Sequence, residues 1–65
     1  MGLRHLKELR TYMEQNAEKA FSRTELRLEL KQNYPTILAN IDYLMVQEGV
    51  VKILPGEPKK FQWKK

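Results

Sequence analysis

Apolar residues recur at helical spacing near the start of the chain. Leu6, Leu9 and Met13 follow one another at intervals of three and four residues, and most of the positions between them are polar or charged. This period gathers the apolar side chains on one face of an amphipathic helix. We therefore expect a first helix over about residues 3–16, with this face turned towards the core.

The clearest helix-start signal in the chain comes next, at Ser22. Ser22 followed three residues later by Glu25 predicts a capping box, in which each side chain bonds to the backbone N–H of the other residue. Phe21 before the cap and Leu26 inside the helix form the matching hydrophobic staple. Ala20 and Phe21 themselves predict a short extended piece, the first strand of a small sheet.

A third helix is predicted to begin around Asn33. Pro35 suits the first turn of a helix, where its missing N–H is not needed, and Asn33 or Tyr34 lies at the cap. The apolar stripe that follows consists of Ile37, Ile41 and Leu44. Gly49 fits the left-handed position just past a helix end. We expect this helix to cover about residues 34–48.

Beyond Gly49 the pattern changes to alternation, which is typical of strands. One face of the predicted sheet would hold Val51, Ile53, Phe61 and Trp63, and the other Lys52, Lys60, Gln62 and Lys64. Pro55 and Gly56 fit the two central positions of a type II turn. We expect a β-hairpin over about residues 50–64, with its aromatic residues closing the core beneath the sheet.

The positive charge of the chain is concentrated in this hairpin. The net charge is +4, and residues 1–49 carry seven Lys/Arg against seven Asp/Glu, which cancel. The excess therefore lies in residues 50–65, which carry five lysines against Glu57 alone. A localised basic patch on a small domain indicates a polyanionic partner.

Composition excludes several other classes of protein. The 65 residues include no cysteine, so neither disulfides nor a thiolate zinc site can stabilise the fold. The longest apolar run is far too short for a membrane span, and the start lacks a secretory segment. We therefore expect a cytoplasmic protein without a membrane partner. Ser22 is the only serine and His5 the only histidine, so we expect no enzyme, no cofactor and no metal site.

The run FSRTELRLELKQNYPTILANIDYLMVQEGVV, followed by the hairpin, resembles the winged helix-turn-helix regulators of bacteria, archaea and their viruses and plasmids. The resemblance implies an α+β, mainly α, winged helix-turn-helix fold with three helices and a C-terminal β-hairpin wing. It implies one domain over residues 1–65, with the helix-turn-helix at about 22–48. It also implies a double-stranded DNA-binding protein, a transcriptional regulator.

Carried over by position, the resemblance assigns a DNA-binding role to particular residues. In the family the start of the third helix enters the major groove, which makes Asn33, Tyr34, Thr36 and Asn40 the candidate base readers. In the family the wing lies along the backbone or the minor groove, so Lys59 and Lys60 become candidate phosphate contacts, and Arg23, Arg27 and Lys31 can add backbone contacts. Tyr34 has a second interpretation, in which it covers the crossing of the second and third helices.

Two departures from the family pattern bear on sequence discrimination. The third helix has no Lys or Arg, and two places after Ile37, where family members often carry a polar or basic residue, it has Ala39, preceded by Leu38. Leu44 stands five residues before Gly49, one more than the usual spacing, so the end of this helix is expected to be longer or distorted.

Alternative functions stay open at this point. A winged helix used for protein–protein contact would rely on Leu38, Tyr43 and Val46. A winged helix that binds RNA or single strands would require exposed Phe61 and Trp63 as stacking platforms. A homodimer through the first helix, with Tyr12 and the side of Leu3 available, is also expected. The pattern leaves no room for a ligand-sensing module, so we expect no small-molecule ligand.

Overall fold

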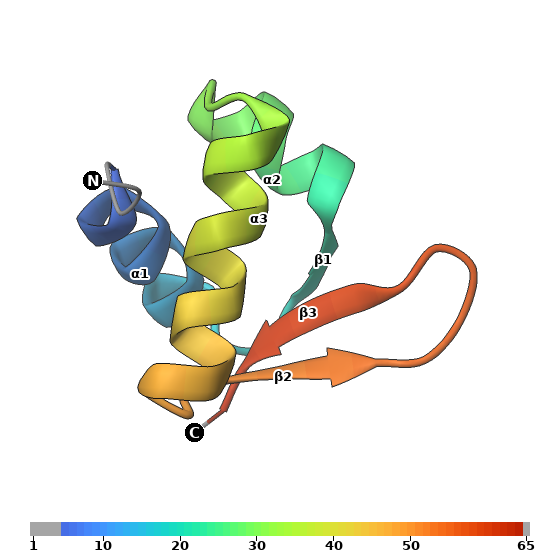
Figure 1. The fold of residues 1–65 in the computed structure, drawn as a ribbon. Coiled ribbons are helices and arrows are strands. Elements are labelled where there is room, and N and C mark those ends of the chain that lie inside the picture. The colour runs from blue at the N-terminus through green and yellow to red at the C-terminus, as the bar shows by residue number, and fades with distance from the viewer. Residues whose placement is uncertain (1–4, 65) are drawn as a thin grey trace.

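The computed structural model describes residues 5–64 (Figure 1), which form a small α+β domain. The elements in chain order are α1 (Leu6–Gln15), β1 (Ala20–Ser22), α2 (Arg23–Leu30), α3 (Tyr34–Asp42), the π-helical segment η1 (Tyr43–Gln47), β2 (Val51–Leu54) and β3 (Lys60–Trp63). The sheet is antiparallel with strand order β1-β3-β2. The arrangement is compatible with a winged-helix layout. Positions 3 and 4 of the predicted first helix lie outside the described residues.

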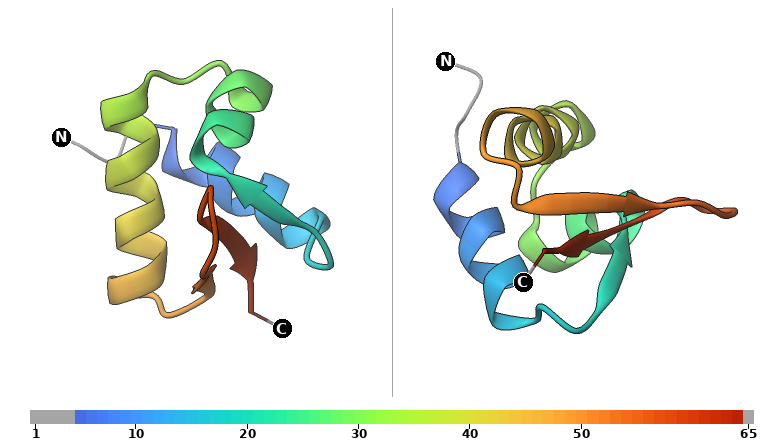
Figure 2. Two further views of the ribbon diagram at one scale, coloured as in Figure 1. Left: turned by 90° about the vertical axis from the view of Figure 1, so that its right-hand side faces the viewer. Right: turned by 90° about the horizontal axis from the view of Figure 1, so that it is seen from below.

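The helices gather around one core, and the β2–β3 hairpin projects away from them (Figures 1 and 2). The core contains Leu9, Met13, Phe21, Leu26, Ile37, Ile41, Leu44, Val51 and Phe61. Every helix and every strand contributes to it, so the fold depends on long-range packing rather than on any single element. Within residues 5–64, no helix is long and apolar enough to cross a membrane.

The predicted start of α2 is confirmed. The backbone N–H of Glu25 donates to Ser22 Oγ over 3.1 Å, and the N–H of Ser22 donates to Glu25 Oε1 over 2.8 Å. The second bond lowers the pKa of the Glu25 carboxyl, because it favours the charged form. Phe21 and Leu26 are both buried, as the hydrophobic staple requires. Together these contacts fix the point at which β1 turns into α2.

The start of α3 and its predicted distortion are also confirmed. Asn33 Oδ1 accepts the backbone N–H of Thr36 over 3.0 Å, and Pro35 occupies the first turn. The helix then widens into η1, where a π-helical turn accommodates one extra residue. Leu44 therefore stays fully buried although it stands five residues before Gly49, which has φ 64° as the left-handed helix end requires.

The hairpin pairs as the alternation predicts, but its turn differs. Val51 lies opposite Trp63, and Ile53 lies opposite Phe61. Phe61 is only 5% exposed and Trp63 packs partly buried against the core, so neither ring stands free as a stacking platform. Residues 55–59 link the strands, and Gly56 has φ 138°, far from the value of about 80° in a type II turn. The prediction of a type II turn centred on Pro55 and Gly56 is therefore wrong, because Gly56 does not have the required backbone conformation and the whole of residues 55–59 connects β2 to β3.

Candidate nucleic-acid interface

A surface hollow lies where the start of α2, the first turns of α3 and the hairpin loop meet. Its volume is about 350 Å³ and its lining consists of Ser22, Arg23, Thr24, Tyr34, Leu38, Pro58 and Lys59. Three segments far apart in the sequence therefore contribute to one surface. Among the described residues, the lining includes two cations and no carboxylate. The hollow is thus suited to an anion rather than to a cation.

Tyr34 lines this hollow from the start of α3 and contacts two residues of α2. Its hydroxyl shares a 2.6 Å hydrogen bond with Thr24 Oγ1, and the Arg27 guanidinium lies 5.0 Å from the centroid of its ring. The bond with Thr24, followed by the positive charge of Arg27, lowers the pKa of the Tyr34 hydroxyl. Tyr34 therefore covers the crossing of α2 and α3, as one interpretation predicted, while 43% of it remains exposed.

Arg23 and Lys59 reach the hollow from separate elements. Arg23 is the first residue of α2, where the unpaired N–H groups of the helix add partial positive charge. Lys59 lies in the hairpin loop, just before β3, and the hairpin extends from the body of the protein as a wing would (Figure 2). Both side chains are exposed. Their positive charges can therefore contact a ligand that spans the two elements.

The remaining predicted residues divide between neighbouring positions. Lys31, Asn33 and Thr36 line a second, smaller hollow at the turn between α2 and α3. Lys31 is exposed there and adopts a left-handed conformation with φ 56°, which ends α2. Lys60 is exposed on β3, and its charge contributes to the lowered pKa of Glu25. The predicted cations thus lie at separate places, in the two hollows and on β3, rather than in one cluster.

One predicted base reader is buried, and the side-chain oxygen of another is engaged in a helix cap. Asn40 is 0% exposed, so its side chain cannot reach a base edge, and its assignment as a base reader is wrong. It lies on the core side of α3 between Ile37 and Ile41. Asn33 is exposed, but its side-chain oxygen already caps α3. Bidentate pairing of Asn33 with adenine would need that oxygen and would therefore break the cap.

The outward face of α3 and η1 has a different character from the hollow. Leu38, Ala39, Asp42 and Val46 are exposed there. Leu38 is 41% exposed and Val46 66% exposed, and neither α3 nor η1 contains a Lys or Arg. This face is therefore apolar with one negative charge, and only its leading part, at Tyr34 and Leu38, borders the cationic hollow.

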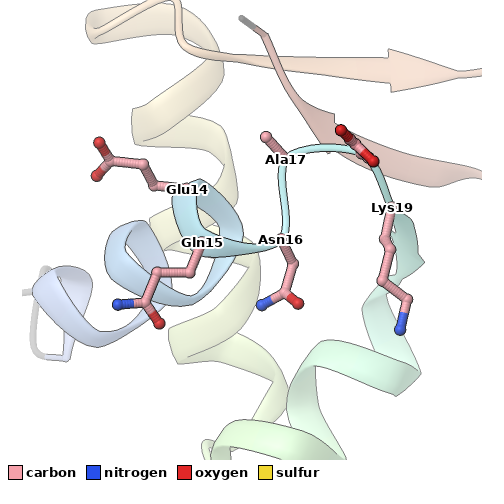
Figure 3. Close-up of a pocket in the computed structure, with 6 residues that line it drawn as sticks. Glu14, Gln15, Asn16, Ala17 and Lys19 are labelled. Carbon is pink, nitrogen blue, oxygen red and sulfur yellow. The ribbon is translucent and has the colours of Figure 1, made fainter.

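Another hollow occupies the loop between α1 and β1, and its lining has the character of an ordinary solvated loop. It is lined by residues 14–19, whose labelled side chains diverge from one another (Figure 3). Glu14 and Lys19 point in different directions there, so their charges do not converge on a common point. Within residues 5–64, no group of three His, Cys, Asp or Glu side chains is placed to hold a metal ion.

Comparisons with protein-family models, with curated proteins and with solved structures found no match. The case for a function therefore rests on the geometry and charge of the surfaces described above.

Sequence reasoning did not assign Thr24 and Pro58 to the interface. Thr24 is the second residue of α2, and its hydroxyl shares a hydrogen bond with Tyr34 at the start of α3, a contact that depends on how the two helices pack. Pro58 carried no local signal either, since its approach to α2 and α3 depends on the three-dimensional course of residues 55–59.

Proposed function

We propose that this protein is a winged-helix, double-stranded DNA-binding protein that acts as a transcriptional regulator. The observation that carries the proposal is the hollow between α2, α3 and the hairpin, to which Arg23 and Lys59 contribute positive charge and no carboxylate contributes negative charge. A duplex presents phosphates at regular intervals along both strands, so cations on separate elements can contact it at the same time. In this proposal, the leading end of α3 faces the major groove and the hairpin lies along the backbone or the minor groove.

The balance of contacts in this complex favours the DNA backbone over the base edges. Phosphates would meet Arg23 at the start of α2, Lys59 and Lys60 on the hairpin, and Lys31 at the turn. Base edges would meet Tyr34 and the half-buried Thr36. Asp42 is exposed at the far end of α3 and would repel phosphates, so it weakens the contact of the duplex with that part of the helix. Backbone contacts position such a protein, and base contacts specify its site.

The test is a titration of a labelled duplex of random sequence at low and at higher salt. Each phosphate neutralised by the protein contributes a slope of about −0.9 to log K against log salt, so binding must weaken steeply as salt rises. Replacing Lys59 and Lys60 together with Glu is expected to remove most of the binding.

The matched control replaces Lys52 and Lys64 together with Glu, because these exposed lysines belong to the same sheet region but do not line the hollow. Both double variants change the net charge equally. Equal losses in the two variants would mean that only overall charge matters, and the proposed interface would be wrong. No binding by the parent protein to any duplex would end the proposal.

A second candidate function, contact with another protein, is favoured by the exposed apolar face of α3 and η1. Leu38 and Val46 leave large apolar surfaces in solvent, and Asp42 lies between them in sequence. Salt-insensitive association that depends on Val46, together with no effect of added DNA, would support this function over the first.

Homodimer formation through α1 is retained as a part of the proposal. Leu3 lies outside the described residues, but Tyr12 lines a hollow together with Leu28, which is 61% exposed. Burial raises the pKa of the Tyr12 hydroxyl, and its ring lies 5.2 Å from that of Phe21. Dimerisation would present two copies of α3 to the DNA, about one helical turn or roughly 34–36 Å apart.

A further inference from the structure

The part of α3 that borders the cationic hollow offers an apolar side chain rather than a hydrogen-bonding one. Leu38 lines the hollow together with Arg23 and Lys59, and 41% of it is exposed. The polar alternatives nearby are already engaged or hidden. Asn40 is buried, and the Tyr34 hydroxyl bonds to Thr24. If a duplex occupies this surface, the side chain that meets the base edges beyond Tyr34 is therefore an aliphatic one.

Major-groove base edges present mostly hydrogen-bond donors and acceptors. The apolar group among them is the C5-methyl of thymine, and apolar side chains recognise it by direct contact. A methylated cytosine carries a methyl group on the same ring carbon. We propose that Leu38 is a specificity-determining residue that packs against the C5-methyl group of a pyrimidine in the major groove. This inference rests on the proposed function, because it requires a duplex at the hollow.

The surroundings of Leu38 fit this role. It lies one turn after Tyr34, near the leading end of α3, and an α-helix is narrow enough to enter the major groove. The neighbouring Arg23 and Lys59 are placed to hold phosphates while Leu38 meets the groove floor. Val46, although more exposed, is two turns farther along, lies in η1 and does not line the hollow. Leu38 and Val46 are therefore a matched pair of exposed aliphatic residues, of which one is at the interface.

The experiment compares duplex pools that differ only in the C5-methyl group. One pool is made of random-sequence duplexes with thymine, and a second has deoxyuridine at every thymine position and ordinary cytosine. A third pool also has deoxyuridine at every thymine position but carries 5-methylcytosine in place of cytosine. Binding of the full chain is measured by fluorescence anisotropy under one buffer condition. The parent protein is expected to bind the thymine pool roughly fourfold more tightly than the deoxyuridine pool, the factor that corresponds to burying about one methyl group.

The variants assign this preference to a residue. Leu38→Ser is expected to abolish the preference for thymine, whereas Val46→Ser is expected to leave it unchanged. Thermal unfolding followed by circular dichroism verifies that both variants are folded, and Leu38→Ala serves as a milder second variant. Tighter binding to the 5-methylcytosine pool than to the matching cytosine pool means that the protein contacts the C5-methyl group of both thymine and 5-methylcytosine. Equal binding of these two pools means that it contacts the methyl group of thymine alone.

The failures are distinguishable from one another. Equal binding of the thymine and deoxyuridine pools by the parent protein overturns the role of Leu38 and leaves DNA binding intact. A preference that persists in Leu38→Ser and Leu38→Ala also overturns it. If none of the pools binds, the proposed function itself fails, and the inference fails with it.

Discussion

The start of α2 together with the hairpin loop, and the outward face of α3, border the same hollow but differ in chemistry. The first region presents Arg23 and Lys59 without a neighbouring carboxylate in the lining, whereas the second presents Leu38, Ala39 and Asp42. Positive charge supplies affinity for any duplex, and base-edge contacts supply discrimination among sequences. In the proposed complex with DNA, the elements that contact phosphates are therefore distinct from the element that contacts base edges, and the base contacts involve few polar side chains.

Among single substitutions, the largest expected effect comes from reversing the charge of Arg23. Arg23→Glu removes a phosphate contact and adds repulsion, so affinity for a duplex should fall on the order of tenfold at low salt, with a slope against log salt reduced by about 0.9. Folding should not suffer, because an acidic residue in the first turn of a helix is favourable. The measurement is the salt-dependent titration, accompanied by thermal unfolding.

Lys7→Glu is the matched control for this variant, because Lys7 is an exposed cation on α1 outside the hollow. If Lys7→Glu weakens binding as much as Arg23→Glu, the positive region is not localised at α2, and the contrast between the two regions disappears.

The sequence was sufficient to predict those features that local chemistry determines. The capping box of Ser22 and Glu25, the cap at Asn33, the left-handed Gly49 and the strand alternation each depend on neighbours within a few residues, and each is present in the structure. The extra residue between Leu44 and Gly49 even indicated the distortion that η1 represents. These signals are strong because caps and turns need specific side chains at fixed offsets.

The site itself was less predictable. The spacing of Asn40 matched the core stripe, three residues after Ile37 and four before Leu44, but the resemblance to winged-helix regulators made it a candidate base reader, a role that requires an exposed side chain. The structure buries it completely. The path of residues 55–59 and the approach of Pro58 to α3 depend on tertiary packing. No local sequence pattern in these residues predicts that packing.

A smaller effect, a gain rather than a loss of affinity for a duplex, is expected when the outward face of α3 is given positive charge like that of the start of α2 and the hairpin loop. Asp42→Lys replaces the exposed carboxylate on α3 with a cation, so affinity for random duplex should rise roughly threefold at low salt and the salt slope should steepen by about 0.9. Asp42→Asn separates loss of repulsion from gain of a contact, since it should raise affinity without steepening the slope. An unchanged affinity in both variants would show that α3 does not face the duplex beyond its first turns.

The smallest expected effect concerns Tyr34, where the two regions meet. The hydrogen bond with Thr24, together with the charges of Arg27 and Arg23, lowers the pKa of this hydroxyl relative to an ordinary tyrosine, whereas burial raises that of Tyr12. Tyr34 should therefore ionise before Tyr12 as pH rises, and the new negative charge beside Arg27 should weaken DNA binding slightly. The pKa of the Tyr34 hydroxyl is lower in the folded state than in the unfolded state. Ionisation of Tyr34 therefore stabilises the folded state at pH values above the unfolded-state pKa. This stabilisation is lost as the pH falls through the folded-state pKa. Weaker binding in alkaline solution would therefore not reflect unfolding caused by this group.

The measurement is an alkaline titration of tyrosinate absorbance in parallel with duplex binding. Tyr34→Phe should remove the earliest ionisation step and the accompanying loss of affinity, while Tyr12→Phe should remove a later step and leave binding unchanged. Thr24→Val provides a further check, because it deletes the hydroxyl that bonds to Tyr34 and should shift the earliest step towards higher pH. If binding declines over the same alkaline range in Tyr34→Phe as in the parent, the Tyr34 hydroxyl is not in contact with the duplex, and its role is limited to joining α2 to α3.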